Sequence, residues 1–523
     1  MYIIPQNIKF ETKKLLKFKL SKILDNLTDS FLDNLFYSGS DNKYQNMMLN
    51  LDENIRKAVL KAFKETIQII DKIYCNSKER KQHFNISAHA KRSIVTIFGW
   101  LDIERIYYYD KYNKNSYFCF IDELFNFPKY DRYDKIVKGM AIQNAIQTNQ
   151  KKGAELTNDR LNSCFSSFNN TRQVFISRQD IYLWIDKWNV PNIEYDAIET
   201  DSDTLYIMID EKYIHEQIKN IIGKNEAKTE TTNSEKIKGD ILAIAETLIH
   251  PKKQLLLPPP KKKSKHFIMS KAFITFTGIH EDHKRRTLEN RTVFLTTSKN
   301  PWDEFMDCIP KIYDFSNYKN IKVLSDAGSW ILSGIHNLKL YADNIITPCL
   351  CEFHVKQKIN RSTKDENLRK RLYQCIENDD KTEFNKIYKE LMKDKPDSRI
   401  KTLKAYKHYI IAHWNAIKEM KKSKYKSSME SHISHNVAKY FSYEPKAYSS
   451  RKIPKLIKLV EYHANGINIL DLYLRTCNND KNIIIKKEEL NFAIFENSSP
   501  SNIPLLYNCS SLTSIALRGL AHP

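Results

Sequence analysis

The chain has 523 residues and nine scattered cysteines, and its Lys and Arg side chains outnumber Asp and Glu by 22. A chain of this length predicts more than one domain. The odd cysteine count and irregular spacing argue against a disulfide framework. No apolar run approaches the roughly 20 residues that a membrane-spanning helix needs, and the first residues lack the apolar core of a signal peptide. We therefore expect a cytoplasmic protein with no membrane partner.

The positive charge favours a polyanionic partner, and nucleic acid is the commonest one. A lysine-rich coding bias is the alternative explanation, because the chain is also rich in Asn and Ile and poor in Gly.

The N-terminal part of the chain has the periodicity of helices up to about residue 95. Residues 93–110 then read as a β-hairpin with its turn near Gly99. Residues 120–190 look helical again, and Ser177 is a candidate N-cap followed by Arg178 and Gln179. With the helix before it this gives a possible helix-turn-helix, in which Arg178 and Gln179 would contact bases. An ordinary packed helix pair fits the pattern equally well.

The stretch from Leu205 to Ile209 is apolar on both faces, which is typical of a strand buried on both sides of a sheet. It ends in the acidic pair Asp210 and Glu211. A charge in such a strand costs several kcal/mol unless it is paired or binds a metal. The simpler alternative is that Asp210 lies at a strand end on the surface.

A second acidic strand end follows a long insert. Residues 216–266 have no sustained periodicity and include a Pro- and Lys-rich run. Two further strands follow, and then a helix that Asn300 caps. Residues 321–324 form a short apolar strand that ends at Asp326. Carboxylates at such strand ends can converge at one edge of a sheet, where α/β folds place their sites.

Residues 331–427 are expected to be mostly helical and to form an insertion. Glu430 then shares one helix face with Ile433 and Val437, in line with an apolar stripe. Such an acid either points into a site or stabilises the helix dipole at the N-terminus. Zinc is a weaker alternative: Cys349, Cys351 and His354 are close in sequence, but no second ligand pair is near.

Three motifs together resemble a known family. They are LYIMIDEKYIHEQ around Asp210, IKVLSDAGSWI around Asp326 and SMESHISHNVAKYF around Glu430. In this order they resemble the DDE transposases of the ISLre-type bacterial insertion sequences. There are two lesser matches: TIFGWLDIERIYYYD lies before the three motifs, and CEFHVKQKI lies between the second and the third.

The resemblance implies an α/β catalytic core of RNase H-like fold with a helical insertion, preceded by a mainly α DNA-binding region. It implies that Asp210, Asp326 and Glu430 are catalytic and hold two Mg²⁺ ions, for which Mn²⁺ can substitute. Hard carboxylate oxygens suit Mg²⁺, and two such ions can activate the attacking oxygen and stabilise the leaving one. His435, Arg451 and Lys452 are further candidates for DNA contact.

The implied function is Mg²⁺-dependent DNA cleavage and 3′-hydroxyl strand transfer. The partners would be double-stranded DNA, namely the terminal inverted repeats and the target, and the protein would be a nucleoid-associated homo-oligomer in a bacterial cytoplasm. A stand-alone RNase H-like nuclease and a non-catalytic or decayed DNA-binding protein are the alternatives.

The expected domains are a helical region (1–95), a hairpin and helical DNA-binding region (96–195), the first part of the catalytic domain (196–330, with a flexible insert at 216–266), a helical insertion (331–427), the glutamate helix and the next helix (428–475), and a C-terminal tail (476–523).

Overall fold

The computed structural model divides the chain into two units, which are described separately. Unit 1 comprises residues 1–200, 308–314 and 459–523, and unit 2 comprises residues 201–307 and 315–458. Among the described residues, no helix is both long and apolar enough to cross a membrane. The structure describes residues 21–22, 25, 28–29, 32–33, 43–113, 116–127, 129–162, 172–216, 267–282, 285–341, 344–423, 431, 433, 437–441, 448–478 and 483–491.

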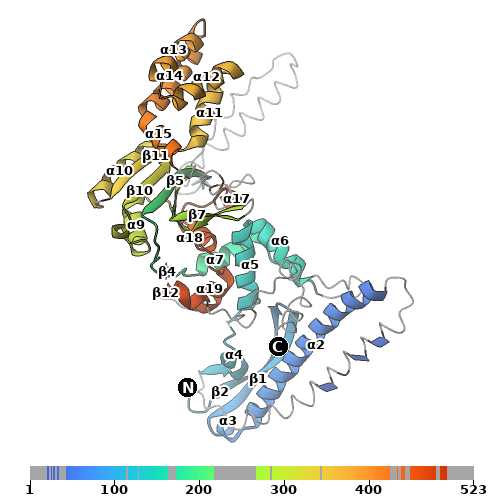
Figure 1. The fold of residues 1–523 in the computed structure, drawn as a ribbon. Helices are drawn as coiled ribbons and strands as arrows, with labels where there is room; N and C mark the ends of the chain where they lie inside the picture. Colours follow the sequence, from blue (N-terminus) through green and yellow to red (C-terminus); the bar gives the residue numbers. More distant parts are fainter. Residues whose placement is uncertain are drawn as a thin grey trace, which may run out of the picture. The chain divides into compact units, whose positions relative to one another are not determined.

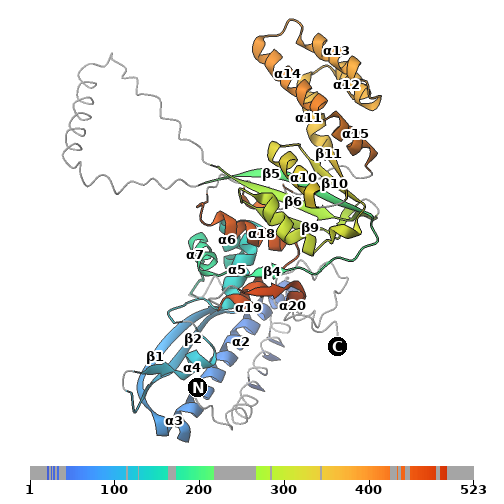
Figure 2. The same cartoon turned by 90° about the vertical axis from the view of Figure 1, so that its left-hand side faces the viewer.

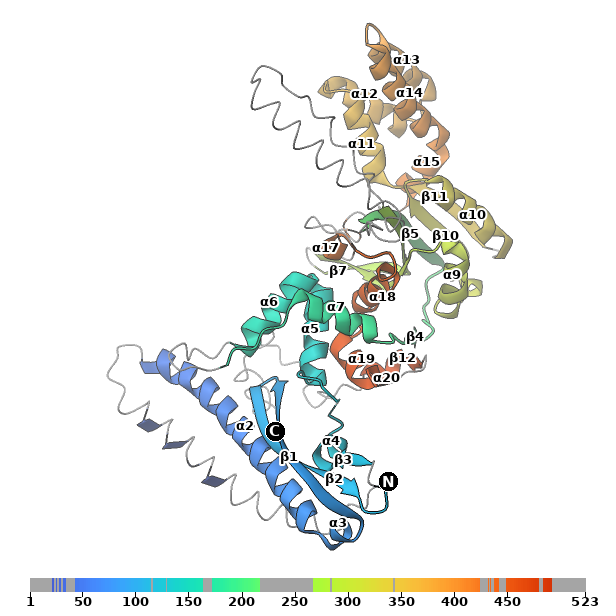
Figure 3. The same ribbon diagram turned by 180° about the vertical axis from the view of Figure 1, so that it is seen from behind.

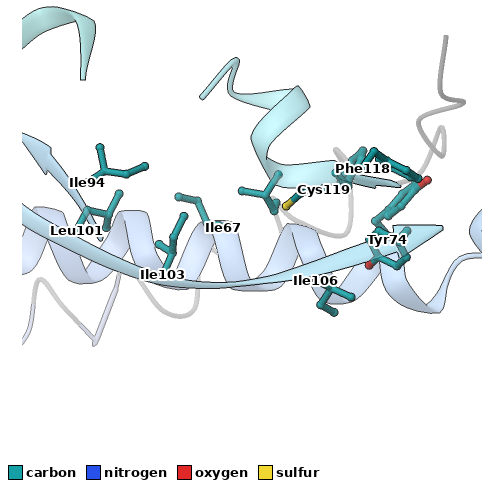
Figure 4. Close-up of a cluster of buried hydrophobic side chains, with 11 residues drawn as sticks. Ile67, Tyr74, Ile94, Leu101, Ile103, Ile106, Phe118 and Cys119 are labelled. Atoms are coloured by element: carbon teal, nitrogen blue, oxygen red, sulfur yellow. The ribbon is translucent and has the colours of Figure 1, made fainter. Parts of the chain in front are cut away.

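Unit 1 begins with a long helix that lies along a β-hairpin (Figure 1). Apolar side chains of the helix, such as Ile67 and Tyr74, pack against Leu101 and Ile103 of the hairpin (Figure 4). This cluster is the core of the N-terminal part of the unit. Its elements are α2 (Lys43–Asn76), α3 (Lys78–His83), β1 (Phe84–Thr96), β2 (Gly99–Asp110), β3 (Tyr117–Cys119) and α4 (Phe120–Leu124).

The hairpin turn falls where the sequence predicts it. Thr96 pairs with Gly99, whose φ of 115° lies in the left-handed region that glycine adopts without strain. The expectation of helix up to residue 95 is wrong at its end, because β1 begins at Phe84. Residues 87–89 of this strand are polar or small and exposed, so its first half carries no apolar alternation.

The second part of unit 1 is mainly helical where the structure describes it, and α5, α6 and α7 pack on one another (Figure 3). Only Thr148 and Asn149 separate the first two, and the Asn149 side chain caps the second helix. The helices are α5 (Lys135–Gln147), α6 (Gln150–Leu161), α7 (Arg178–Lys187) and α19 (Ile469–Thr476), which packs on α5. A short parallel pair, β4 (Asn192–Glu194) with β12 (Ile484–Lys486), and α20 (Lys487–Asn491) complete the described part.

Unit 2 is built on a five-stranded mixed sheet with the order β11-β10-β5-β6-β9. The first three strands in sequence form an antiparallel meander, and the last two add in parallel on the other side of the first. The strands are β5 (Thr204–His215), β6 (Phe267–Phe276), β9 (Thr292–Thr296), β10 (Asn320–Ser325) and β11 (Ile345–Leu350), and a separate hairpin joins β7 (Gly278–Asp282) to β8 (Arg285–Glu289).

Two helices cover one face of this sheet (Figure 2). They are α9 (Pro301–Cys308) and α10 (Ser329–Tyr341). Phe273 of β6 packs against Trp302 and Phe305 of α9 and Trp330 of α10. The predicted start of α9 is confirmed with Pro301 as its first residue, and a 3₁₀ turn containing Pro310 follows it.

The predicted helical insertion is smaller than expected, because residues 345–350 form the edge strand β11. Pro348 lies in this strand, and an edge strand tolerates a residue without an N–H. The helices that follow are α11 (Glu352–Ser362), α12 (Glu366–Glu377), α13 (Lys381–Met392), α14 (Asp397–Ala412) and α15 (Trp414–Lys422), and α15 packs back on β11.

The residues of the expected domain 428–475 are divided between the two units. Within it α17 (Lys439–Phe441) belongs to unit 2, α18 (Ile453–Ala464) crosses the boundary between the units, and α19 belongs to unit 1. The α19 backbone is tied to α5, since Leu470 N donates to Gln143 Oε1 at 2.9 Å.

Candidate functional site

The two predicted aspartates lie near the same end of a parallel strand pair in unit 2. The last pair of β10 and β5 joins Leu324 to Met208; Asp326 is the first residue after β10, and Asp210 is two residues after Met208 in β5. Neighbouring strands are about 4.8 Å apart. The pairing of β5 with β10 therefore places the backbone of Asp326 near that of Asp210, although 116 residues separate them in sequence.

This point of the sheet is a topological switch point. From β5 the chain runs outward through β6 and β9, then returns to the other side of β5 to add β10 and β11. Connections that leave in opposite directions open a crevice at the carboxyl ends of the strands, where α/β sheets bind ligands. Asp326 follows the carboxyl end of β10 directly.

The Asp210 side chain is 8% exposed, and its Oδ1 accepts a hydrogen bond from Glu211 N at 2.7 Å. A carboxylate this deep in an apolar strand requires a partner for its charge. The prediction of a buried acidic strand is confirmed, and the alternative of a surface strand end is wrong, because β5 continues to His215.

Asp326 is held in a tight turn. Its Oδ1 accepts from Gly328 N at 2.9 Å, and Ala327 between them has a φ of 61°. Its backbone carbonyl accepts from the Tyr409 hydroxyl at 2.7 Å. Burial, and then the charge of Asp326, raise the pKa of Tyr409, so this phenol stays a hydrogen-bond donor at neutral pH. Helix α14 thus fixes the Asp326 turn, which sequence patterns did not reveal because Tyr409 lies in an ordinary helical repeat.

Glu211 lies on the opposite face from Asp210, because successive side chains of a strand alternate. Its carboxylate accepts from Trp330 Nε1 at 2.7 Å and from the Tyr213 hydroxyl at 2.9 Å. On the neighbouring strand β6, the residue that pairs with Glu211 is Lys271. Lys271 is buried, and burial lowers its pKa. These contacts anchor β5 beside Asp210 and explain the tryptophan of the second motif, for which the sequence assigns no contact.

The remaining predicted residues are placed as follows. Arg178 and Gln179 are exposed in the first turn of α7 in unit 1. Arg451 is exposed and Lys452 is half-buried, in the turn before α18. Glu430 and His435 lie outside the described residues.

The donor set suits a hard cation better than zinc. Asp210 and Asp326 offer carboxylate oxygens, which Mg²⁺ and Mn²⁺ prefer. Cys349 and Cys351 are buried free thiols, and burial raises the pKa of Cys349 to about 11, which disfavours the thiolate that zinc requires. Within the described ranges no three His, Cys, Asp or Glu side chains form a metal-binding group, and the third predicted ligand is not among those residues.

The chain belongs to the uncharacterised protein family UPF0236, whose profile matches residues 43–228 and 193–474. Similar proteins come from Caldanaerobacter subterraneus subsp. tengcongensis. The UPF0236 protein TTE2489 is 22% identical over 430 residues, covering 80% of this chain and 78% of that protein. The UPF0236 protein TTE0402 is 23% identical over 415 residues, covering 77% and 70%. A third is 21% identical over 428 residues, covering 80% and 78%, and its name joins eleven TTE designations. No solved structure matches the chain significantly.

Proposed function

We propose that this protein is the DNA transposase of an insertion sequence, with Asp210, Asp326 and Glu430 as its catalytic acids. The proposed reaction is metal-dependent cleavage of a phosphodiester bond, followed by joining of the freed 3′-hydroxyl to target DNA. The observation that carries the proposal is the parallel pairing of β5 with β10, since Asp210 lies on β5 and Asp326 directly follows β10.

The sheet of unit 2 supports an RNase H-like core. A meander of three antiparallel strands, with two parallel strands added beside the first, is the strand order of that fold. In this order the first and fourth strands are neighbours, so an acid on the first strand and an acid in the turn after the fourth lie at the same end of the sheet.

The residues on either side of the third acid are compatible with a place beside the first two. Before it, α15 packs on β11 and ends at Lys422. After it, Tyr448 N donates to His215 O at 2.9 Å, at the far end of β5. The described residues before and after Glu430 thus lie beside β11 and beside β5, and β10 lies between those two strands. Ile433 and Val437, the apolar members of the predicted helix face, are buried.

Mg²⁺ would be held by the carboxylates of Asp210, Asp326 and Glu430, and Mn²⁺ could replace it. When bound, it would neutralise charge on the phosphate and lower the pKa of the attacking hydroxyl or water. The chain's own contribution is to hold the acids rigidly, through the Gly328 and Tyr409 contacts of Asp326 and the buried position of Asp210.

Two further observations support DNA as the partner and a mobile element as the source. The excess of 22 positive charges favours a polyanion. The name of one relative joins eleven designations from one organism, as expected for a gene present in many copies. A transposing element produces such copies. We also propose that the protein acts as a homo-oligomer on its DNA ends in a bacterial cytoplasm.

The test is a cleavage and strand-transfer assay with the purified full chain and duplexes that cover both borders of its gene. We expect Mg²⁺-dependent cuts and joined products. Asp210→Asn and Asp326→Asn should each lower the rate by at least about 100-fold, because each removes a metal ligand. DNA affinity at a fixed salt concentration should stay within about twofold, because neither side chain contacts phosphate directly in this scheme.

The control is Asp307→Asn, an exposed carboxylate on α9, which should cleave like the unchanged chain. Cleavage without strand transfer would identify a nuclease instead. Equal activity of the unchanged chain and both aspartate variants would refute the proposed site.

A further inference from the structure

One exposed aromatic side chain in unit 1 is held with unusual rigidity. In the extended segment before α7, Val174 and Ile176 are 4% and 1% exposed, whereas Phe175 between them is 73% exposed. Single exposed apolar residues are common and need no explanation. Phe175 differs because both of its neighbours are fixed in place.

Two asparagines clamp this segment, Asn158 of α6 and Asn162, the residue that follows its last turn. Asn158 Nδ2 donates to Ile176 O and its Oδ1 accepts from Ile176 N, both at 2.8 Å. Asn162 makes the same pair of bonds to Val174, at 2.7 and 2.8 Å. The two asparagines are four residues apart and therefore share one face of the helix. The backbone on both sides of Phe175 is thereby fixed, and its side chain is turned outward.

Further contacts secure the segment from the other side. The Tyr133 hydroxyl donates to Phe175 O at 2.7 Å. The Arg172 guanidinium lies 3.6 Å from the centre of the Trp100 ring, and Trp100 Nε1 donates to Gln173 O at 3.5 Å. A side chain presented from a rigid backbone loses little conformational entropy when it binds a partner.

The position of Phe175 relates it to a helix start that suits DNA. Ser177 caps α7 with a complete capping box, so the Asp180 carboxylate is bound to the Ser177 backbone and hydroxyl. Arg178 is exposed in the first turn, and Arg172 is exposed at the start of the segment. The first turn also holds one acid, Asp180, whose carboxylate is engaged by Ser177, so residues 172–180 carry two arginines against one acid. This net positive charge suits a polyanion, and a helix that reads DNA contacts the major groove with its first turn.

We propose that Phe175 contacts the 5-methyl group of a thymine in the major groove, beside the base pair that Arg178 or Gln179 reaches. The thymine methyl is the one apolar group that the major groove offers, and a phenyl ring is a known type of partner for it. The inference rests on the proposed DNA-binding function and adds the element of sequence that this surface would recognise.

The experiment uses the full chain and a duplex that it enriches from a random DNA pool. Each thymine of the enriched duplex is replaced in turn by 2′-deoxyuridine, which removes only the methyl group. For the unchanged chain we expect one replacement to weaken binding about threefold to fivefold, the effect of exposing about one buried methyl group. For Phe175→Ala the same replacement should have no effect, while the affinity for the thymine duplex should already be lower by at least that factor.

Tyr112→Ala, which changes another exposed aromatic residue of unit 1, is the matched control and should keep the full sensitivity to deoxyuridine. Equal sensitivity of the unchanged chain and Phe175→Ala would overturn the inference and leave the proposed DNA binding intact. An absence of any enriched sequence would also overturn it. An absence of all salt-dependent DNA affinity would overturn both proposals.

Discussion

At the scale of single residues, the most informative feature is the placement of charge in apolar surroundings. Asp210 is nearly buried in a strand whose other members from Leu205 to Ile209 are buried and uncharged. Asp326 adds a second carboxylate directly after the neighbouring strand β10. A divalent cation held by both carboxylates, as proposed, would balance their charges.

A buried acid of unit 1 yields a prediction about pH. Asp71 is 3% exposed, and burial raises its pKa to about 6, although its Oδ2 accepts a hydrogen bond from Ile106 N. The folded chain therefore holds a proton between about pH 4 and 6 that the unfolded chain has released. The free energy of unfolding should fall as pH rises through this window, by about 2 to 3 kcal/mol from this group.

Asp71→Asn should remove that part of the fall and keep an acceptor for Ile106 N. Some pH dependence should remain, because burial also raises the pKa of Asp134 to about 6. Urea unfolding followed by circular dichroism at pH 4, 5, 6 and 7 measures the effect. Asp159→Asn, at an exposed position on α6, is the control. A pH profile identical in Asp71→Asn and the unchanged chain would refute the assignment.

At the scale of elements, the contact between α5 and α6 depends on a glycine. A Cβ atom on Gly153 would lie 2.5 Å from the backbone N and Cα of Ala145. These are backbone atoms, so the two helices would have to move apart. Gly153→Ala should lower the free energy of unfolding of unit 1 by about 1 to 3 kcal/mol, despite the better helix propensity of alanine.

The urea midpoint of Gly153→Ala against the unchanged chain is the measurement. Lys151 is exposed in the same helix, and Lys151→Ala should change the free energy of unfolding by less than about 0.5 kcal/mol. A midpoint for Gly153→Ala as high as that of Lys151→Ala would show that the helices are not closely packed there.

Elements with a clear apolar pattern could be predicted from the sequence. The first half of β5 and the end of β6 are buried on both faces and mostly apolar, and Ile321, Val323 and Leu324 give β10 a buried apolar part. The edge strand β11 was missed, because it has six residues and contains Pro348. The first half of β1 lacks the apolar alternation that predicts a strand, because residues 87–89 are polar or small.

Contacts between distant parts of the chain could not be predicted from local patterns. The position of Asp326 near Asp210 depends on the pairing of β10 with β5, and only the whole sheet defines that strand order. The bond from Tyr409 to Asp326 spans 83 residues, and the bond from Leu470 to Gln143 spans 327. Both donors lie in helices whose sequences are ordinary. The sequence therefore predicts the acids of the site but not the side chains that hold them.

At the scale of the whole molecule, the two units divide the proposed work. Unit 1 presents the exposed first turn of α7 and the clamped segment before it, which suit recognition of DNA. Unit 2 presents two carboxylates at the switch point of its sheet, which suit phosphoryl transfer. The excess of 22 positive charges belongs to the chain as a whole and favours its association with DNA.

The central claim is that three acids from distant parts of the chain hold one cluster of divalent ions. The most direct measurement is the anomalous diffraction of Mn²⁺ in crystals of the full chain bound to one of its cleaved DNA ends. Two manganese ions about 4 Å apart, coordinated by oxygens of Asp210, Asp326 and Glu430, are the predicted result. Manganese bound elsewhere, with the Glu430 carboxylate outside the reach of both aspartates, would contradict it.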